Sequence, residues 1–185
     1  MSWGITPQDF ELWLSRTTNE ADPAERKKQV AELFDEFQAA LESAIKNAPN
    51  TLFVCSAGNS DSDATFIEHL PSAFYLPNLI AVGAVNQAGD ETSFTSYGST
   101  VAVDADGFQV ESTVPGGGTL RASGTSAASP QVANLAAKLI ALDSALTPEQ
   151  VIDLIKRGAT TSEDGRRHLI DEKRSVALLN EHAKK

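Results

Sequence analysis

The chain of 185 residues has little cysteine, little positive charge and no long hydrophobic run. Its single cysteine, Cys55, excludes an internal disulfide and says little about the cellular compartment. No run of about 18 apolar residues occurs, so no segment is expected to span a membrane. No basic segment followed by an apolar one marks a signal peptide at the N-terminus. The 15 basic and 25 acidic residues give a net charge of −10, which argues against nucleic acid as a partner.

The acidic excess is uneven along the chain. Residues 51–142 carry 8 acids and 2 bases, whereas residues 143–185 carry 8 of each. A solubilising surface accounts for such an excess, which would also repel anionic partners and weakly favour basic peptides. With 41% hydrophobic residues and neither repeats nor a clear linker, residues 1–185 are expected to form a single domain or part of a larger one.

The order of apolar patterns predicts an α/β fold. Apolar residues recur at helical spacing between Pro23 and Pro49, and continuous apolar runs at 51–55 and 79–85 are typical of strands buried on both faces. Strand, helix and strand in alternation imply a parallel sheet with helices on both faces. Residues 7–22 are expected to form a loop with a short helix around Phe10–Leu14. The other expected elements are strands near 100–103 and 109–114 and helices at 131–142, 151–157 and 173–182.

A glycine turn runs into an Ala-rich helical pattern at residues 124–142 and places the hydroxyl of Ser126 in the first helical turn. The unpaired N–H groups and the positive dipole end at such a place favour a developing oxyanion. Small residues beside Ser126 leave room for the backbone of a substrate. The alternative is that Ser126 or Thr125 only caps the helix, which is the commonest use of a hydroxyl there.

The segment GTSAASPQVA closely resembles the nucleophile motif of the subtilisin-like serine peptidases (subtilases), G-T-S-[small or Met]-[AS]-[ST]-P-x-V-A. The resemblance implies that Ser126 is the catalytic nucleophile and forms an acyl-enzyme during peptide hydrolysis. The segment VCSAGN, which ends at Asn59, resembles the family's strand ending in A-[AS]-G-N. There the Asn side-chain amide donates to the oxyanion, which implies the same role for Asn59. An Asn in a left-handed turn is the ordinary alternative for a Gly-Asn pair.

Further segments resemble the family in the family's order. Ser2-Trp3-Gly4 resembles M-S-[LWF]-G, which pairs with the substrate backbone as an extra strand. Trp3 would flank the pocket for the side chain before the scissile bond, and residues 56–58 would form the opposite wall. Residues 80–85 and 93–98 resemble I-A-V-G-A-V and F-S-[SN]-x-G, but Ala105-Asp106-Gly107 departs from the family's A-P-G. The substrate-binding residues implied by the resemblance are Ser2, Trp3, Gly4, Ser56, Ala57, Gly58 and Thr125.

The family's Asp motif, D-[ST]-G, and its His motif, H-G-T-x-[VA]-A, occur nowhere in the chain. His69, His168 and His182 lack that context and are interpreted as ordinary surface histidines. A serine hydroxyl is a poor nucleophile without a base, so the chain is expected to be inactive alone. The resemblance implies that residues 1–185 are the C-terminal part of a subtilase catalytic domain, with the N-terminal strands of the sheet absent.

Three functions therefore stand as alternatives: a serine endopeptidase whose Asp and His lie outside this chain, a catalytically dead binding or interaction module, and an unrelated α/β domain with a fortuitous motif. The expected partners are a peptide or protein substrate and the missing N-terminal half, or a second copy pairing through the open sheet edge. No cofactor is expected in this chain. Calcium is frequent in the family, but Asp61 and Asp63 are too few to form a ligand set. Most family members are secreted, although the sequence itself assigns no compartment.

Overall fold

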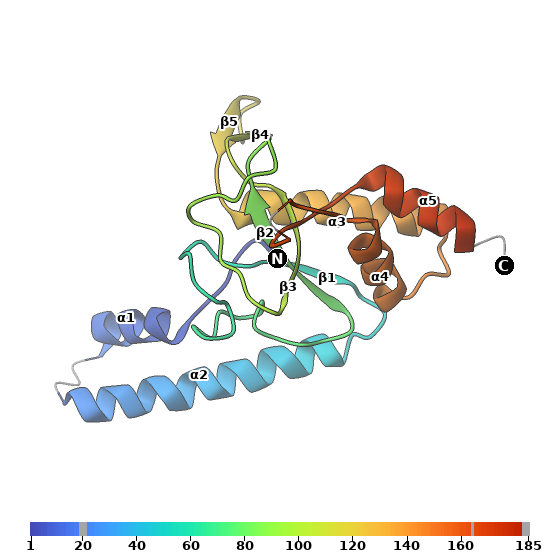
Figure 1. Ribbon diagram of the computed structural model, residues 1–185. Coiled ribbons are helices and arrows are strands. Elements are labelled where there is room, and N and C mark those ends of the chain that lie inside the picture. Colours follow the sequence, from blue (N-terminus) through green and yellow to red (C-terminus); the bar gives the residue numbers. More distant parts are fainter. Residues whose placement is uncertain (19–21, 164, 183–185) are drawn as a thin grey trace.

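The computed structural model describes residues 1–18, 22–163 and 165–182, and it has the expected α/β architecture (Figure 1). Among the described residues, no helix combines the length and hydropathy needed to cross a bilayer. The elements in chain order are α1 (Pro7–Thr17), α2 (Pro23–Lys46), β1 (Phe53–Ser56), β2 (Leu79–Val85), β3 (Val101–Asp106), β4 (Val110–Thr113), β5 (Thr119–Ala122), α3 (Thr125–Leu142), α4 (Pro148–Gly158), β6 (Thr160–Thr161), β7 (His168–Leu169) and α5 (Glu172–His182).

The main sheet has five strands in the order β1-β2-β3-β7-β6. Strands β1, β2, β3 and β7 pair in parallel, with Val54 opposite Ile80, and only β6 pairs antiparallel, with β7. The predicted parallel sheet is therefore confirmed. Strands β4 and β5 form a separate antiparallel hairpin that projects from the body of the molecule.

Helices cover both faces of the sheet, as the sequence pattern predicts. Helix α2 covers one face, where Phe34 packs in a cluster with Cys55 of β1. Helices α3, α4 and α5 cover the other face, where Val132 belongs to the same cluster as Val54 and Val82. Successive strand residues point to opposite faces, so strands covered on both sides need an unbroken apolar run. Burial raises the pKa of the Cys55 thiol to about 12, so this residue acts as a small apolar core residue.

The first residues of the chain lie along the free side of β1. The amide N–H of Ser56 donates to the carbonyl oxygen of Met1 at 3.1 Å, and the N-terminal ammonium of Met1 donates to the carbonyl oxygen of Val54. Ile5 and Leu70 then exchange two antiparallel hydrogen bonds of 3.0 and 2.9 Å. Residues 1–5 are thereby fixed beside the carboxyl end of β1, where the candidate site lies.

The expectation of a loop with a short helix at Phe10–Leu14 is wrong in its extent. Helix α1 occupies Pro7–Thr17, because Pro7 begins it with a preset backbone angle. The carboxylate of Asp9 accepts hydrogen bonds from the backbone N–H and the hydroxyl of Thr6, both at 2.8 Å. The ring of Phe10 packs edge-on against Phe34 of α2. This tertiary contact stabilises the helix and could not be predicted from the local sequence.

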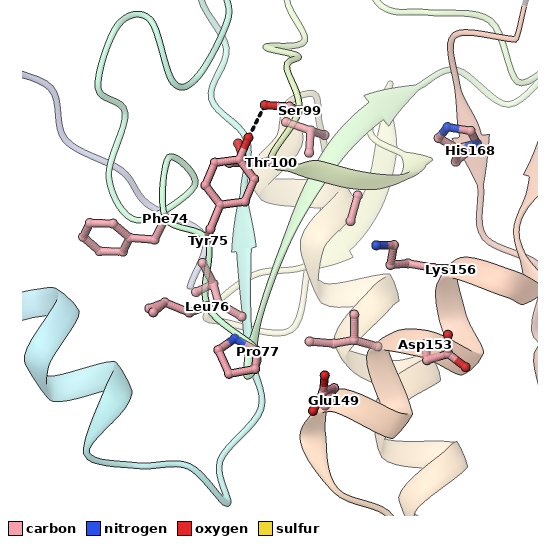
Figure 2. Close-up of a pocket in the computed structure, with 14 residues that line it drawn as sticks. Phe74, Tyr75, Leu76, Pro77, Ser99, Thr100, Glu149, Asp153, Lys156 and His168 are labelled. Atoms are coloured by element: carbon pink, nitrogen blue, oxygen red, sulfur yellow. Dashed lines mark hydrogen bonds between the residues drawn. The ribbon is translucent and has the colours of Figure 1, made fainter.

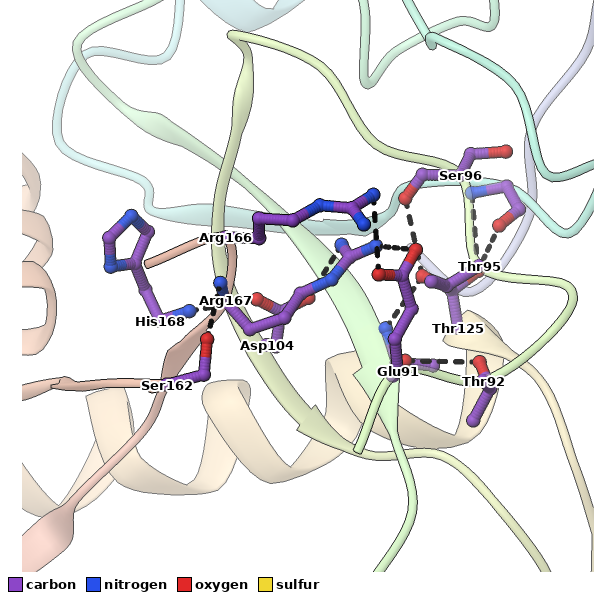
Figure 3. Close-up of polar contacts among 12 residues, drawn as sticks. Glu91, Thr92, Thr95, Ser96, Asp104, Thr125, Ser162, Arg166, Arg167 and His168 are labelled. Atoms are coloured by element: carbon purple, nitrogen blue, oxygen red, sulfur yellow. Dashed lines mark hydrogen bonds and ion pairs between the residues drawn. The ribbon is translucent and has the colours of Figure 1, made fainter. Parts of the chain in front are cut away.

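A buried ion-pair network connects the short antiparallel strands β6 and β7 to β3 (Figure 3). The guanidinium of Arg167 lies 3.5 Å from the carboxylate of Asp104 and also contacts Glu91, and the Arg167 and Asp104 side chains are only 5% and 4% exposed. Asp104 also accepts a hydrogen bond of 3.0 Å from the backbone N–H of His168. Burial raises the pKa of Asp104, while the His168 N–H and Arg167 oppose that shift. The network holds β7 in parallel register beside β3.

Candidate active site

Ser126 is the second residue of α3, whose N-cap is Gly124. The cap position is therefore occupied by a residue without a side chain, and the hydroxyls of Thr125 and Ser126 lie inside the helix and do not cap it. The Thr125 hydroxyl points instead toward β1, where it accepts a hydrogen bond from Gly58 N–H at 3.2 Å. The capping alternative for Ser126 and Thr125 is therefore wrong. Ser126 Oγ forms no hydrogen bond with any residue that the structure describes, so this hydroxyl is half-buried but uncommitted.

Asn59 follows the carboxyl end of β1, and two donors on Thr125 fix its side-chain amide. Asn59 Oδ1 accepts from the backbone N–H of Thr125 at 2.8 Å and from the Thr125 hydroxyl at 3.0 Å. An amide oxygen held by two donors directs the NH₂ group the other way. The left-handed backbone expected of a turn Asn is found at the preceding Gly58, with φ +109°, and not at Asn59.

The Ser126 hydroxyl and the Asn59 amide face one small volume beside Gly124. A methyl group placed on Gly124 would lie 2.9 Å from Ser126 Oγ and 3.3 Å from Asn59 Nδ2. Gly124 itself has φ +152°, a conformation that side chains disfavour, so glycine is required both by its backbone and by the space. The structure thus brings the two predicted catalytic side chains together beside Gly124.

The predicted substrate-binding segments lie next to this volume. Ser2 Oγ lies 3.1 Å from Ser129 Oγ, which is one helical turn beyond Ser126, so residues 2–4 are held against the start of α3. Trp3 is 45% exposed, as a side chain at the rim of a pocket would be. Residues 56–58, in contrast, are buried and present backbone.

His69 lies between these two segments, which the interpretation as a surface histidine did not anticipate. A methyl group on Gly4 would lie 2.0 Å from His69 Cε1, and one on Gly58 would lie 3.3 Å from His69 Nε2. The ring therefore occupies space that the two glycines leave. Burial lowers the pKa of His69, and the negative charge of Asp9 opposes that shift. The sequence offered one clue, the two glycines, but not which side chain fills their space.

The other two histidines belong to different parts of the molecule. His168 lines a pocket of 610 Å³ together with Lys156 and Asp153 of α4, and neither Ser126 nor Asn59 is among the lining residues (Figure 2). His182 is the last residue of α5. Within the described residues, no histidine donates to or accepts from the Ser126 hydroxyl.

Asp63, one of the two acids considered for metal binding, is engaged in local contacts. One Asp63 oxygen accepts from the backbone N–H of Thr65 at 2.9 Å and of Phe66 at 3.2 Å, and contacts the Thr65 hydroxyl. The Thr65 hydroxyl, chiefly, together with these N–H groups, lowers the pKa of Asp63. The part of the chain that the structure describes contains no group of three or more His, Cys, Asp or Glu side chains able to hold a metal ion.

Comparisons with known proteins show which family the chain is similar to. The family model described as Subtilase family matches residues 1–173. Subtilisin of Bacillus pumilus is 38% identical over 124 residues, which are 65% of this chain and 44% of that protein. Alkaline serine exoprotease A of Vibrio alginolyticus is 36% identical over 124 residues, 66% of this chain and 22% of that protein. The chain thus spans less than half the length of these relatives.

Solved structures give the same result. A cold-adapted subtilisin-like serine proteinase matches with a TM-score of 0.64 and 33% identity over 71% of this chain and 49% of its own. The self-cleaved protease domain of PatA matches with a TM-score of 0.63 and 27% identity over 96% of this chain and 69% of its own. Since the family model covers nearly all of the sequence, the chain belongs to the subtilase family.

Proposed function

We propose that this chain supplies the nucleophile and the oxyanion-binding groups of a subtilisin-like serine endopeptidase. Ser126 Oγ attacks the carbonyl carbon of a peptide bond and gives its proton to a base, which returns a proton to the leaving amine. Water then hydrolyses the acyl-enzyme at Ser126. The observation that supports this most strongly is the convergence of Ser126 Oγ and Asn59 Nδ2 on the space beside Gly124.

The negative charge of the tetrahedral intermediate would be bound by two donors. Asn59 Nδ2 is one, and the backbone N–H of Ser126, in the first turn of α3, is the other. Thr125 acts as a positioning residue, since it holds the Asn59 amide in the donating orientation. One such side-chain donor contributes about 2.7–4 kcal/mol to lowering the barrier, a magnitude measured on subtilisin, a member of this same family.

The base is proposed to come from outside these 185 residues. No described histidine contacts Ser126, and the family's Asp and His motifs are absent from the sequence. The chain alone is therefore expected to be inactive toward peptides. Residues 1–3, which follow the free side of β1, form the sheet edge to which an N-terminal half bearing the Asp and His would add, or through which two copies would pair.

A fluorophosphonate probe tests the proposal. The chain is incubated with the probe alone and then together with an N-terminal subtilase fragment that carries the Asp and His motifs. We expect labelling of Ser126 only in the mixture, with none for Ser126→Ala, and labelling of Asn59→Ala slower by about a hundredfold or more. His168→Gln, altered in the pocket of Figure 2, serves as a control that should label like the unmodified chain.

Failure to label in a mixture that forms a stable complex by gel filtration would contradict the peptidase proposal. It would favour the alternative, a binding module that keeps the cleft without the chemistry. Labelling of the chain alone would show that a base within the 185 residues had been overlooked.

A further inference from the structure

We infer that His69 recognises the side chain that precedes the scissile bond and selects a polar one, an amide at neutral pH and a carboxylate in acid. This inference rests on the proposed function, because it takes the space beside Gly124 as the site of the scissile carbonyl. The inference extends the proposed function by naming the class of side chain that the site would prefer. That preference would depend on His69, which lies between Gly4 and Gly58.

The position of the ring supports this role. Its Nε2 edge faces both glycines, lying 2.1 Å from a methyl group placed on Gly4 and 3.3 Å from one placed on Gly58. Gly58 immediately precedes Asn59, the proposed donor to the scissile carbonyl. The ring fills the space between the two glycines, so a side chain attached next to that carbonyl and directed toward them would meet the imidazole.

The hydrogen bonds around the ring select one neutral tautomer. His69 Nδ1 lies 2.7 Å from Ser72 Oγ, and that fully buried hydroxyl also lies 3.3 Å from the carbonyl oxygen of Ala57 and 3.0 Å from that of His69. Carbonyl oxygens only accept, and the buried Ala57 carbonyl has the Ser72 hydroxyl as its donor. Ser72 thus donates to a carbonyl and accepts from Nδ1–H of the ring. Nε2 is left as an acceptor, and it has no hydrogen-bond partner among the described residues.

An acceptor in the pocket favours substrate side chains that carry an N–H donor. The lowered pKa of His69 keeps the ring neutral at neutral pH. The segments that contact the ring, at Gly4, Gly58 and Ser72, carry no charge, and Asp9 of α1 is the ionised group that acts on it. In acid the ring gains a proton on Nε2 and becomes a charged donor, which favours a carboxylate.

Binding of three product-like peptides to the 185-residue chain tests the inference without requiring catalysis. Acetyl-Ala-Ala-Pro-Gln, its Glu counterpart and its Leu counterpart are titrated by NMR up to millimolar concentration at about pH 7.5 and at a lower pH at which the imidazole nitrogen signals show a protonated ring. We expect Gln to bind about tenfold more tightly than Glu at the higher pH. Relative to Leu, Glu should gain about tenfold at the lower pH. Nitrogen NMR of the imidazole should show Nδ1–H as the neutral tautomer and a shift of Nε2 when the Gln peptide binds.

Variants separate recognition from a structural role. His69→Leu should fold, lose the Gln preference and lose the pH effect, whereas the matched control His168→Leu should keep both. No detectable binding of any peptide, equal binding of Gln and Glu, or a pH effect that survives in His69→Leu would overturn the inference. Peptide binding and fluorophosphonate labelling are independent measurements, because the product-like peptides bind without reacting. His69-dependent binding without fluorophosphonate labelling would therefore remove the peptidase proposal alone, and labelling without His69-dependent selectivity would remove this inference alone.

Discussion

Replacing Thr125 by Val tests whether its hydroxyl organises the oxyanion-binding groups. Valine keeps the shape of the fully buried side chain but removes Oγ1, which lies 3.2 Å from Gly58 N and 3.0 Å from Asn59 Oδ1. The buried N–H of Gly58 would lose its acceptor, at a cost of about 1–3 kcal/mol. Asn59 would keep only the bond from the backbone N–H of residue 125. We therefore expect the free energy of unfolding to fall by about 2 kcal/mol and Tm by about 4–8 °C.

The control is Thr125→Ser, which keeps the hydroxyl and loses one buried methyl group, at a cost of about 1 kcal/mol. Urea unfolding followed by tryptophan fluorescence measures both variants. The Asn59 side-chain amide signals in NMR should shift and broaden in Thr125→Val and stay in place in Thr125→Ser. If the serine variant is the less stable of the two, or if the Asn59 signals are unchanged in the valine variant, then the hydroxyl does not hold the amide and the reasoning fails.

Three further predictions concern single contacts. Gly124→Ala should abolish fluorophosphonate labelling in the complemented mixture by filling the space beside Ser126, whereas Gly116→Ala, which also has positive φ but no neighbour within 4 Å, should label normally. Arg167→Met leaves Asp104 buried without its cation and should cost about 3–5 kcal/mol of unfolding free energy in urea, whereas Lys46→Met, at a surface pair, should cost less than about 1 kcal/mol. The folded-state pKa of His69 is lowered, so its contribution to stability is present above about pH 6.5 and is lost as pH falls through the folded pKa. In His69→Gln, the free energy of unfolding in urea should therefore depend less steeply on pH in that range. An unchanged slope would refute the burial of the ring.

Elements with strong local patterns were predictable. Helix α2 has an apolar stripe at helical spacing, and β1 and β2 are unbroken apolar runs. The structure confirms these elements within a few residues. Ser126 and Asn59 were identified as a pair by their resemblance to the family's motifs, and the carboxyl edge of a parallel sheet is where such residues gather. Their meeting beside Gly124 follows from this topology.

Features that depend on contacts between distant segments were not predictable. Helix α1 mixes polar and apolar residues along its sequence, and it is fixed by Phe10 packing on α2. The strand expected near 109–114 is confirmed as β4, but its partner β5 is exposed along its whole length and was not expected. Arg167 follows another arginine in a charged stretch that is typical of a surface, yet its guanidinium is buried, because it pairs with the buried carboxylate of Asp104 within β3.

The geometry of Asn59 and Ser126 is determined by contacts within this chain, and this separates binding of the oxyanion from activation of the nucleophile. Thr125 orients the amide, Gly124 leaves the space, and α3 supplies the N–H groups, all without an imidazole base. Preorganised donors of this kind lower the barrier only once the hydroxyl can be deprotonated. The proposed endopeptidase and the alternative binding module would therefore differ only in whether a base is present. A chain that gained the base by complementation would need no rearrangement around Gly124, so NMR signals of Asn59 and Thr125 should change little when the N-terminal fragment binds.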